Sequence, residues 1–113
     1  MLWTGSEILK TYIMLMKFTG AGAEGVKQAQ AGRAAGKKAA KALGIKWKQQ
    51  YVLLGQYDIL TVVEAPDEET IATFALLGGM SGSFEIQTMR AFTEAEADAL
   101  IKSLPDNGSA GEE

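Results

Sequence analysis

Apolar residues fill both alternating sets of positions in the stretch Lys10 to Phe18, KTYIMLMKF. A strand with one face in water alternates apolar and polar residues, so this pattern predicts a central strand covered on both faces. Three later stretches are also typical of strands, at 45–54, 57–65 and 84–92. The tight turn of the hairpin between the second and third strands is expected at Gly55–Gln56.

The spacing of small and apolar residues becomes helical after the first strand. A helix is predicted from about Ala23 to Leu43, and Gly44 occupies its C-cap position. Interior glycines weaken a helix, so their recurrence on one side indicates a surface that another part of the protein approaches closely. That stripe consists of Gly25, Ala29, Gly32, Gly36, Ala39 and Leu43.

Two shorter helices carry start signals. Asp67 is a good N-cap for a helix that should end at Gly78–Gly79. Thr93 and Glu96 match a capping box at the start of a last helix, which should reach about residue 104.

The elements follow the order strand, helix, strand, strand, helix, strand, with a terminal helix added. This order predicts an α+β, ferredoxin-like βαββαβ fold with a four-stranded antiparallel sheet in the order 4-1-3-2. Both main helices then lie on one face of the sheet, and the apolar residues of the other face need a cover. We expect a second copy of the chain to provide it, in a homodimer or a higher oligomer.

A length of 113 residues indicates one domain. We assign residues 1–9 to an N-terminal extension, 10–104 to the folded domain and 105–113 to a disordered tail. The apolar runs are far shorter than the roughly 20 residues that span a bilayer, and the N-terminus lacks the early positive charge of a signal peptide. We therefore expect a cytoplasmic protein without a membrane partner.

The chain contains neither cysteine nor histidine. The commonest metal ligands and the commonest acid–base group at neutral pH are thus missing, so we expect no metal site and no cofactor.

Seven of the 11 basic residues lie between Lys27 and Lys48, although the net charge is −3. RNA-recognition domains share the predicted topology, but the stretch YDILTVVEA lacks their basic aromatic motif, and we expect no nucleic-acid partner. The basic cluster is most simply a solvated helix face or a surface for an acidic partner. Trp47 and Tyr51 are expected to share one face of their strand, as core or interface residues.

Three motifs in sequence order resemble the GYD domain family. They are a Gly-x-Tyr-Asp element at Gly55 to Asp58, a Glu-Ala-Pro-Asp element at Glu64 to Asp67, and a Thr-x-Arg-Ala-Phe-Thr element at Thr88 to Thr93. The resemblance covers about residues 11–104, and it implies ferredoxin-like protomers that pair sheet to sheet as a dimeric α/β-barrel. The family is a small bacterial and archaeal one of unknown activity, so the resemblance implies no catalytic residues.

Charged side chains at the ends of the predicted first, third and fourth strands are candidates for a site. Antiparallel order brings Lys17 near Asp58, and it places Glu64 and Arg90 beside Tyr12. In a pocket, the carboxylates would accept a proton and the cations would bind an anionic group. Structural ion pairs are the alternative, which we favour because no nucleophile is evident. The candidate pocket or ion-pair residues are Lys17, Tyr57, Asp58, Glu64 and Arg90.

Two functions remain open from the sequence. The first is an oligomeric small-molecule-binding or assembly protein, with a small anionic or aromatic ligand. The second is a cofactor-independent enzyme of the dimeric α/β-barrel type, with Tyr57, Asp58, Glu64 or Arg90 taking part in proton transfer or desolvation of a small organic substrate. The missing histidine and cysteine favour the first hypothesis.

Overall fold

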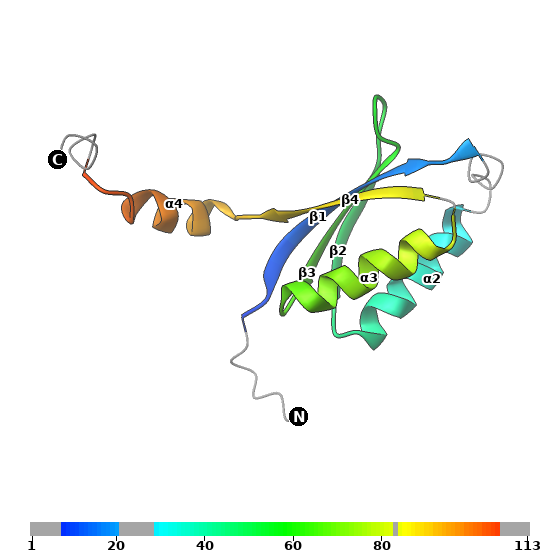
Figure 1. Cartoon of the computed structure of the whole chain (residues 1–113), viewed down its shortest axis with the longest axis horizontal. Coiled ribbons are helices and arrows are strands. Elements are labelled where there is room, and N and C mark those ends of the chain that lie inside the picture. The colour runs from blue at the N-terminus through cyan, green and yellow to red at the C-terminus, as the bar shows by residue number, and fades with distance from the viewer. Residues whose placement is uncertain (1–7, 21–28, 83, 107–113) are drawn as a thin grey trace.

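The computed structural model describes residues 8–20, 29–82 and 84–106 (Figure 1). Most of the expected N-terminal extension, the expected helical residues before Ala29 and most of the expected tail lie outside these ranges. The described elements are β1 (Lys10–Phe18), α2 (Ala29–Ala42), β2 (Lys46–Val52), β3 (Ile59–Ala65), α3 (Glu68–Met80), β4 (Phe84–Ala91) and α4 (Glu94–Lys102).

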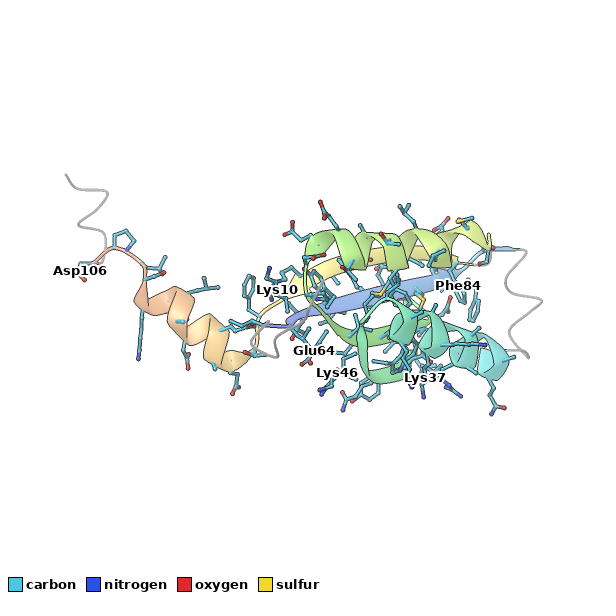
Figure 2. All side chains as sticks on the ribbon, turned by 90° about the horizontal axis from the view of Figure 1, so that it is seen from below. Lys10, Lys37, Lys46, Glu64, Phe84 and Asp106 are labelled. Atoms are coloured by element: carbon cyan, nitrogen blue, oxygen red, sulfur yellow. The ribbon has the colours of Figure 1, made fainter. Side chains whose placement is uncertain are left out.

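The four strands form one antiparallel sheet in the order β2-β3-β1-β4, which confirms the predicted ferredoxin-like topology. Helices α2 and α3 lie side by side on the same face of this sheet (Figures 1 and 2). In β3 every second residue, from Ile59 to Ala65, is buried beneath them, and the residues between are only half-buried. The chain itself therefore covers one face of the sheet, and we call the other the open face.

The core lies between the helices and the two central strands. Tyr12 and Met14 from β1 pack with Val63 from β3 and with Ile71 and Phe74 from α3. Burying each apolar side chain of this size contributes on the order of 2 kcal/mol. This cluster fixes α3 on the sheet.

The helix ends depend on glycines at positive φ. Gly44, at φ 78°, ends α2 as predicted, and the N–H of Ile45 reaches back to the carbonyl of Ala40 at 2.8 Å. The predicted stop at Gly78–Gly79 is wrong, because α3 continues to Met80. Gly82, at φ 75°, provides the left-handed residue that ends this segment, since glycine tolerates helical as well as left-handed backbone.

The hairpin loop between β2 and β3 is longer than the tight turn that the sequence suggested. The N–H of Leu53 donates to the carbonyl of Asp58 at 2.8 Å, which leaves the four residues 54–57 outside the paired strands. Gly55 lies there at φ 132°, where a β-carbon would be strained.

A β-bulge interrupts β2 between Trp47 and Gln49. Trp47 pairs with Val63 on the helix-covered face, whereas Tyr51 pairs with Leu60 on the open face. The expectation that Trp47 and Tyr51 share a face is therefore wrong. The extra residue of a bulge reverses the alternation of side chains along the strand.

Helix α4 follows β4 and extends away from the sheet (Figure 1). Its start is as predicted: the Thr93 hydroxyl accepts from the N–H of Glu96, and Glu96 accepts from the N–H of Thr93. The helix buries none of its residues against the protomer. No helix within the described ranges is both long and apolar enough to cross a membrane.

Candidate functional site

Asp58 immediately precedes β3 and joins it to the end of β1. Its Oδ2 accepts a hydrogen bond from the backbone N–H of Phe18 at 2.8 Å, and its own N–H donates to the carbonyl of Met16 at 2.9 Å. The exposed Lys17 forms no ion pair with Asp58, since the ion pair found among the described residues joins Arg90 to Glu96. In the protomer, the Asp58 carboxylate holds the end of a strand.

Tyr57 lies next to Asp58 and bridges two strands that β1 separates. Its hydroxyl donates to Oε1 of Gln87 on β4 at 2.6 Å. Gln87 pairs with Leu15, one of the half-buried residues of the open face. This bond therefore crosses β1 on the open face.

Glu64 is on the open face near the other end of the sheet. It is opposite Thr11 of β1 and opposite Lys46 of β2. The side chain is half-buried. Its position suits either a contact with a partner copy or the cross-strand cation Lys46.

Arg90 is on the helix-covered face, directly opposite Tyr12. Its guanidinium lies 4.2 Å from the ring centroid of Phe92, and its Nη1 lies 3.8 Å from Oε1 of Glu96. Nη1 also donates to the carbonyl of Ala91. Arg90 thus connects β4 to the start of α4.

The five candidate residues do not converge on one pocket within the described structure. Lys17 and Asp58 lie at one end of the sheet and Glu64 at the other, while Arg90 points to the opposite face from Glu64. The two pockets described below are lined by other residues.

Tyr12 carries a buried hydroxyl for which the described structure provides no hydrogen-bond partner. The residue is 3% exposed and packs in the core. Burial raises the pKa of the Tyr12 hydroxyl, and the charges of Glu68 and Asp67 add to this, while Arg90 opposes it. The hydroxyl is therefore held in its neutral form.

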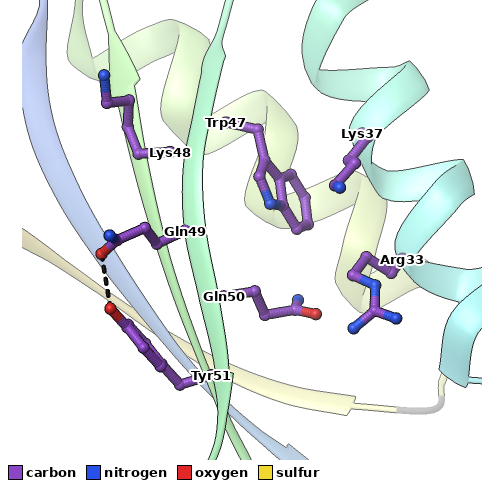
Figure 3. Close-up of a pocket in the computed structure, with 7 residues that line it drawn as sticks. All are labelled: Arg33, Lys37, Trp47, Lys48, Gln49, Gln50 and Tyr51. Carbon is purple, nitrogen blue, oxygen red and sulfur yellow. Dashed lines mark hydrogen bonds between the residues drawn. The ribbon is translucent and has the colours of Figure 1, made fainter.

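A shallow pocket of about 540 Å³, the basic pocket, opens between α2 and the edge strand β2 (Figure 3). The Nζ of Lys37 lies 5.9 Å from the ring centroid of Trp47, within range of a cation–π interaction. The pocket is lined by Arg33, Lys37, Trp47, Lys48, Gln49, Gln50 and Tyr51.

The sequence showed the basic cluster but not this pocket. Its formation depends on the bulge, which turns Trp47 toward α2, and on Gly36, where a β-carbon would lie 3.3 Å from the indole. The stretch WKQQ contains no glycine or proline that would indicate a bulge in the sequence. The stripe of small residues on α2, which includes Gly36, was the local signal for a close approach.

A larger hollow of about 630 Å³, the helix cleft, lies between α2, α3 and the sheet. Trp47, Gln50 and Arg33 line both this cleft and the basic pocket. The two spaces therefore adjoin at the same three side chains.

Large apolar side chains are exposed on α4 and on both sides of it in the chain. Leu100, Ile101 and Leu104 are 49%, 63% and 63% exposed, and Phe92 is 50% exposed. The open face is also apolar at its centre, where Leu15 pairs with Leu60. Such surfaces are characteristic of sites that contact other molecules.

Among the described residues, no group of three or more potential ligand side chains could hold a metal ion.

Known proteins show where this chain belongs. The model of the GYD domain matches residues 12–101. The chain is also 33% identical over 95 residues to a Thermus thermophilus protein named glutamine synthetase and cystathionine beta-lyase binding protein, covering 83% of this chain and 100% of that relative. No solved structure matches significantly. The family model covers most of the folded domain, so the resemblance seen in the motifs is confirmed and the chain belongs to the GYD domain family.

Proposed function

We propose that this protein is a non-catalytic assembly protein that self-associates through the open face and binds another protein through the apolar side of α4. The observation that carries the proposal is α4 itself, a helix of 9 residues with no buried residue and with the large apolar side chains of Leu100 and Ile101 exposed. The name of the Thermus thermophilus relative supports it, because that relative is described as binding two enzymes.

The length of α4 explains why a partner surface is needed. Isolated helices shorter than about 12–15 residues are marginal in water, even with good capping. The capping box at Thr93 favours the start of α4, but the exposed Leu100 and Ile101 gain nothing from the protomer. Packing of this side against another protein would stabilise the helix and remove apolar area from water.

The open face is proposed as the surface between copies of the chain. Ile13 of β1 is flanked by Val62 of β3 and Met89 of β4, and all three are half-buried in the protomer. A second sheet packed on this face would cover the apolar residues that the helices leave open.

Sedimentation and binding measurements separate the two surfaces. We expect the wild type to sediment as a dimer or higher oligomer, and Leu15→Glu to shift it toward the 12.0 kDa protomer. Ile101→Glu should keep the oligomer but lose binding to glutamine synthetase or cystathionine β-lyase from the same organism. Lys102→Ala, next along α4, is the matched control and should retain binding.

Either half of the proposal can fail by itself. If the wild type binds neither enzyme, the assembly role inferred from the relative is wrong. If Ile101→Glu dissociates the oligomer, α4 belongs to the surface between copies. A wild type that sediments only as a protomer at micromolar concentration would overturn self-association.

A further inference from the structure

The helix cleft is too large to be a packing defect. Protein interiors seldom contain voids much larger than a water molecule, whereas small-molecule sites have volumes of roughly 300–1,000 Å³. The cleft has a volume of about 630 Å³, is partly open to solvent, and is lined mainly by apolar side chains, among them Met14, Met16, Phe18, Ile59, Phe74 and Leu77. Its size and lining fit an apolar group such as an alkyl chain.

Small residues on α2 keep this space open. Ala31, Gly32, Ala35 and Gly36 all line the cleft, so no long side chain from these positions fills it. A β-carbon on Gly32 would meet no atom within 4 Å, although close packing was the sequence-based explanation for the glycine. At Gly32 the small residue borders open space in the cleft, whereas at Gly36 it permits a close contact with Trp47.

Gln50 and Thr61 form a hydrogen-bonded polar pair in the lining of the cleft. Gln50 Nε2 donates to Oγ1 of Thr61 at 3.0 Å, and Thr61 is 1% exposed. The Gln50 side chain points from β2 toward Arg33 on α2 (Figure 3). Gln50 and Arg33 thus lie at the side of the cleft that meets the basic pocket.

Cations from α2 lie at that side of the cleft. Arg33 lines both spaces, and Lys37 and Lys48 line the basic pocket. None of these three cations forms an ion pair with any carboxylate in the part of the chain that the structure describes. A hydrogen bond from a guanidinium to an anionic oxygen is stronger than one between neutral groups.

We propose that the helix cleft binds a small amphipathic organic anion, whose apolar body lies between α2 and α3 and whose anionic group is bound by Arg33, with Lys37 beside it. The apolar lining accounts for the body, and Arg33 and Lys37 account for the head group. The site differs from the one expected from the sequence, because it is under the helices and contains none of the five candidate residues. It is also independent of the proposed protein-binding role of α4.

The fluorescence of Trp47, which lines both spaces, reports occupancy. The probe is octanoate, titrated into the full chain carrying Trp3→Phe so that one tryptophan remains. We expect a saturable change with octanoate, none with acetate, and binding of neutral 1-octanol weaker by about tenfold or more. A parallel titration with octyl phosphate distinguishes a carboxylate from a phosphate head group, and tighter binding of either anion than of 1-octanol supports the proposal.

Two variants test the two halves of the site. Arg33→Gln should weaken octanoate binding to the level of 1-octanol without changing the affinity for 1-octanol, and Lys102→Gln on α4 is the matched control. Gly32→Leu should fill the cleft and weaken both probes, whereas Gly32→Ala should leave both nearly unchanged. Leucine is a good helix former, so Gly32→Leu is expected to fold, which circular dichroism checks.

Equal affinity of the wild type for octanoate and 1-octanol would overturn the assignment of the head group to Arg33. The absence of saturable binding of any probe would overturn the site as a whole, as would a Gly32→Leu variant that binds octanoate like the wild type.

Discussion

The carboxylate of Asp58 accepts a hydrogen bond at 2.8 Å from the backbone N–H of Phe18, 40 residues earlier in the chain. Asp58 belongs to the Gly-x-Tyr-Asp element, one of the three motifs through which the sequence resembles the GYD domain family. The bond ties the hairpin loop before β3 to the last residue of β1. The aspartate of the motif thus has a structural role in the protomer.

Asp58→Ala should destabilise the fold, because it leaves the partly buried N–H of Phe18 without its acceptor. Hydrogen bonds to charged groups contribute about 1.5–3 kcal/mol, and we expect a loss of this size in the free energy of unfolding. Asp58→Asn retains an oxygen acceptor and should lose less. Urea denaturation with an unchanged m-value measures both; equal stability of Asp58→Ala and wild type would contradict this role.

Tyr12→Phe should be at least as stable as the wild type near neutral pH. The hydroxyl is buried without a partner in the described structure, so its removal relieves a desolvation cost of about 1 kcal/mol or more. A loss of stability in thermal or urea unfolding would mean that the hydroxyl is bonded in solution.

The alkaline limb of stability should also depend on Tyr12. Because the pKa of Tyr12 is raised above 10.0 in the folded state, the folded protein binds its proton more tightly than the unfolded chain does. The stability that this difference in proton binding contributes is present below pH 10.0, and it is lost as the pH rises through the pKa of Tyr12 in the folded state. Wild type should therefore lose more stability than Tyr12→Phe above that pH, and parallel curves would contradict the shift.

Gly32→Ala and Gly36→Ala form a matched pair on α2. Alanine is favoured over glycine inside a helix by up to about 1 kcal/mol, and at position 32 the new methyl group meets open space. At position 36 it would lie 3.3 Å from the Trp47 ring, so repacking should offset the gain. We expect Gly32→Ala to raise the melting temperature and Gly36→Ala to raise it less or lower it. Equal shifts would mean that the indole does not rest on Gly36.

Asp67 should make the stability of the fold sensitive to acid. Hydrogen bonds from the hydroxyl and then the N–H of Thr70 lower the pKa of Asp67 below 3.8, so the folded state favours the carboxylate. The stability from this cap is present above about pH 4 and is lost as the pH falls through the lowered pKa. Asp67→Asn also caps the helix but does not titrate, so its unfolding midpoint should fall less between about pH 6 and pH 2. Identical acid profiles would exclude Asp67 as a source of the pH dependence.

Local chemistry was readable from the sequence alone. The apolar pattern of β1 and β3, the Asp67 cap, the capping box at Thr93 and the left-handed Gly44 depend on neighbours within a few residues, and the structure has each of them. The sheet topology could be predicted from the order of these elements, because few chain connections are possible between four strands and two helices that cover one face. The end of α3 was misplaced, since glycine is compatible with both a helix and its end.

The site depended on contacts between distant segments. No local signal marks the bulge that turns Trp47 toward α2, and the 40-residue span between Phe18 and Asp58 carries no hint that a carboxylate would bind a backbone N–H instead of Lys17. The spacing of small residues also does not show whether a given one packs closely against a neighbour or borders open space. In α2, Gly36 packs against Trp47, whereas Gly32 borders open space. The sequence determined the elements and their order because short-range forces specify them. Only the tertiary structure determined the helix cleft and the cations beside it, because the shape of a cleft depends on how elements far apart in the sequence pack against one another.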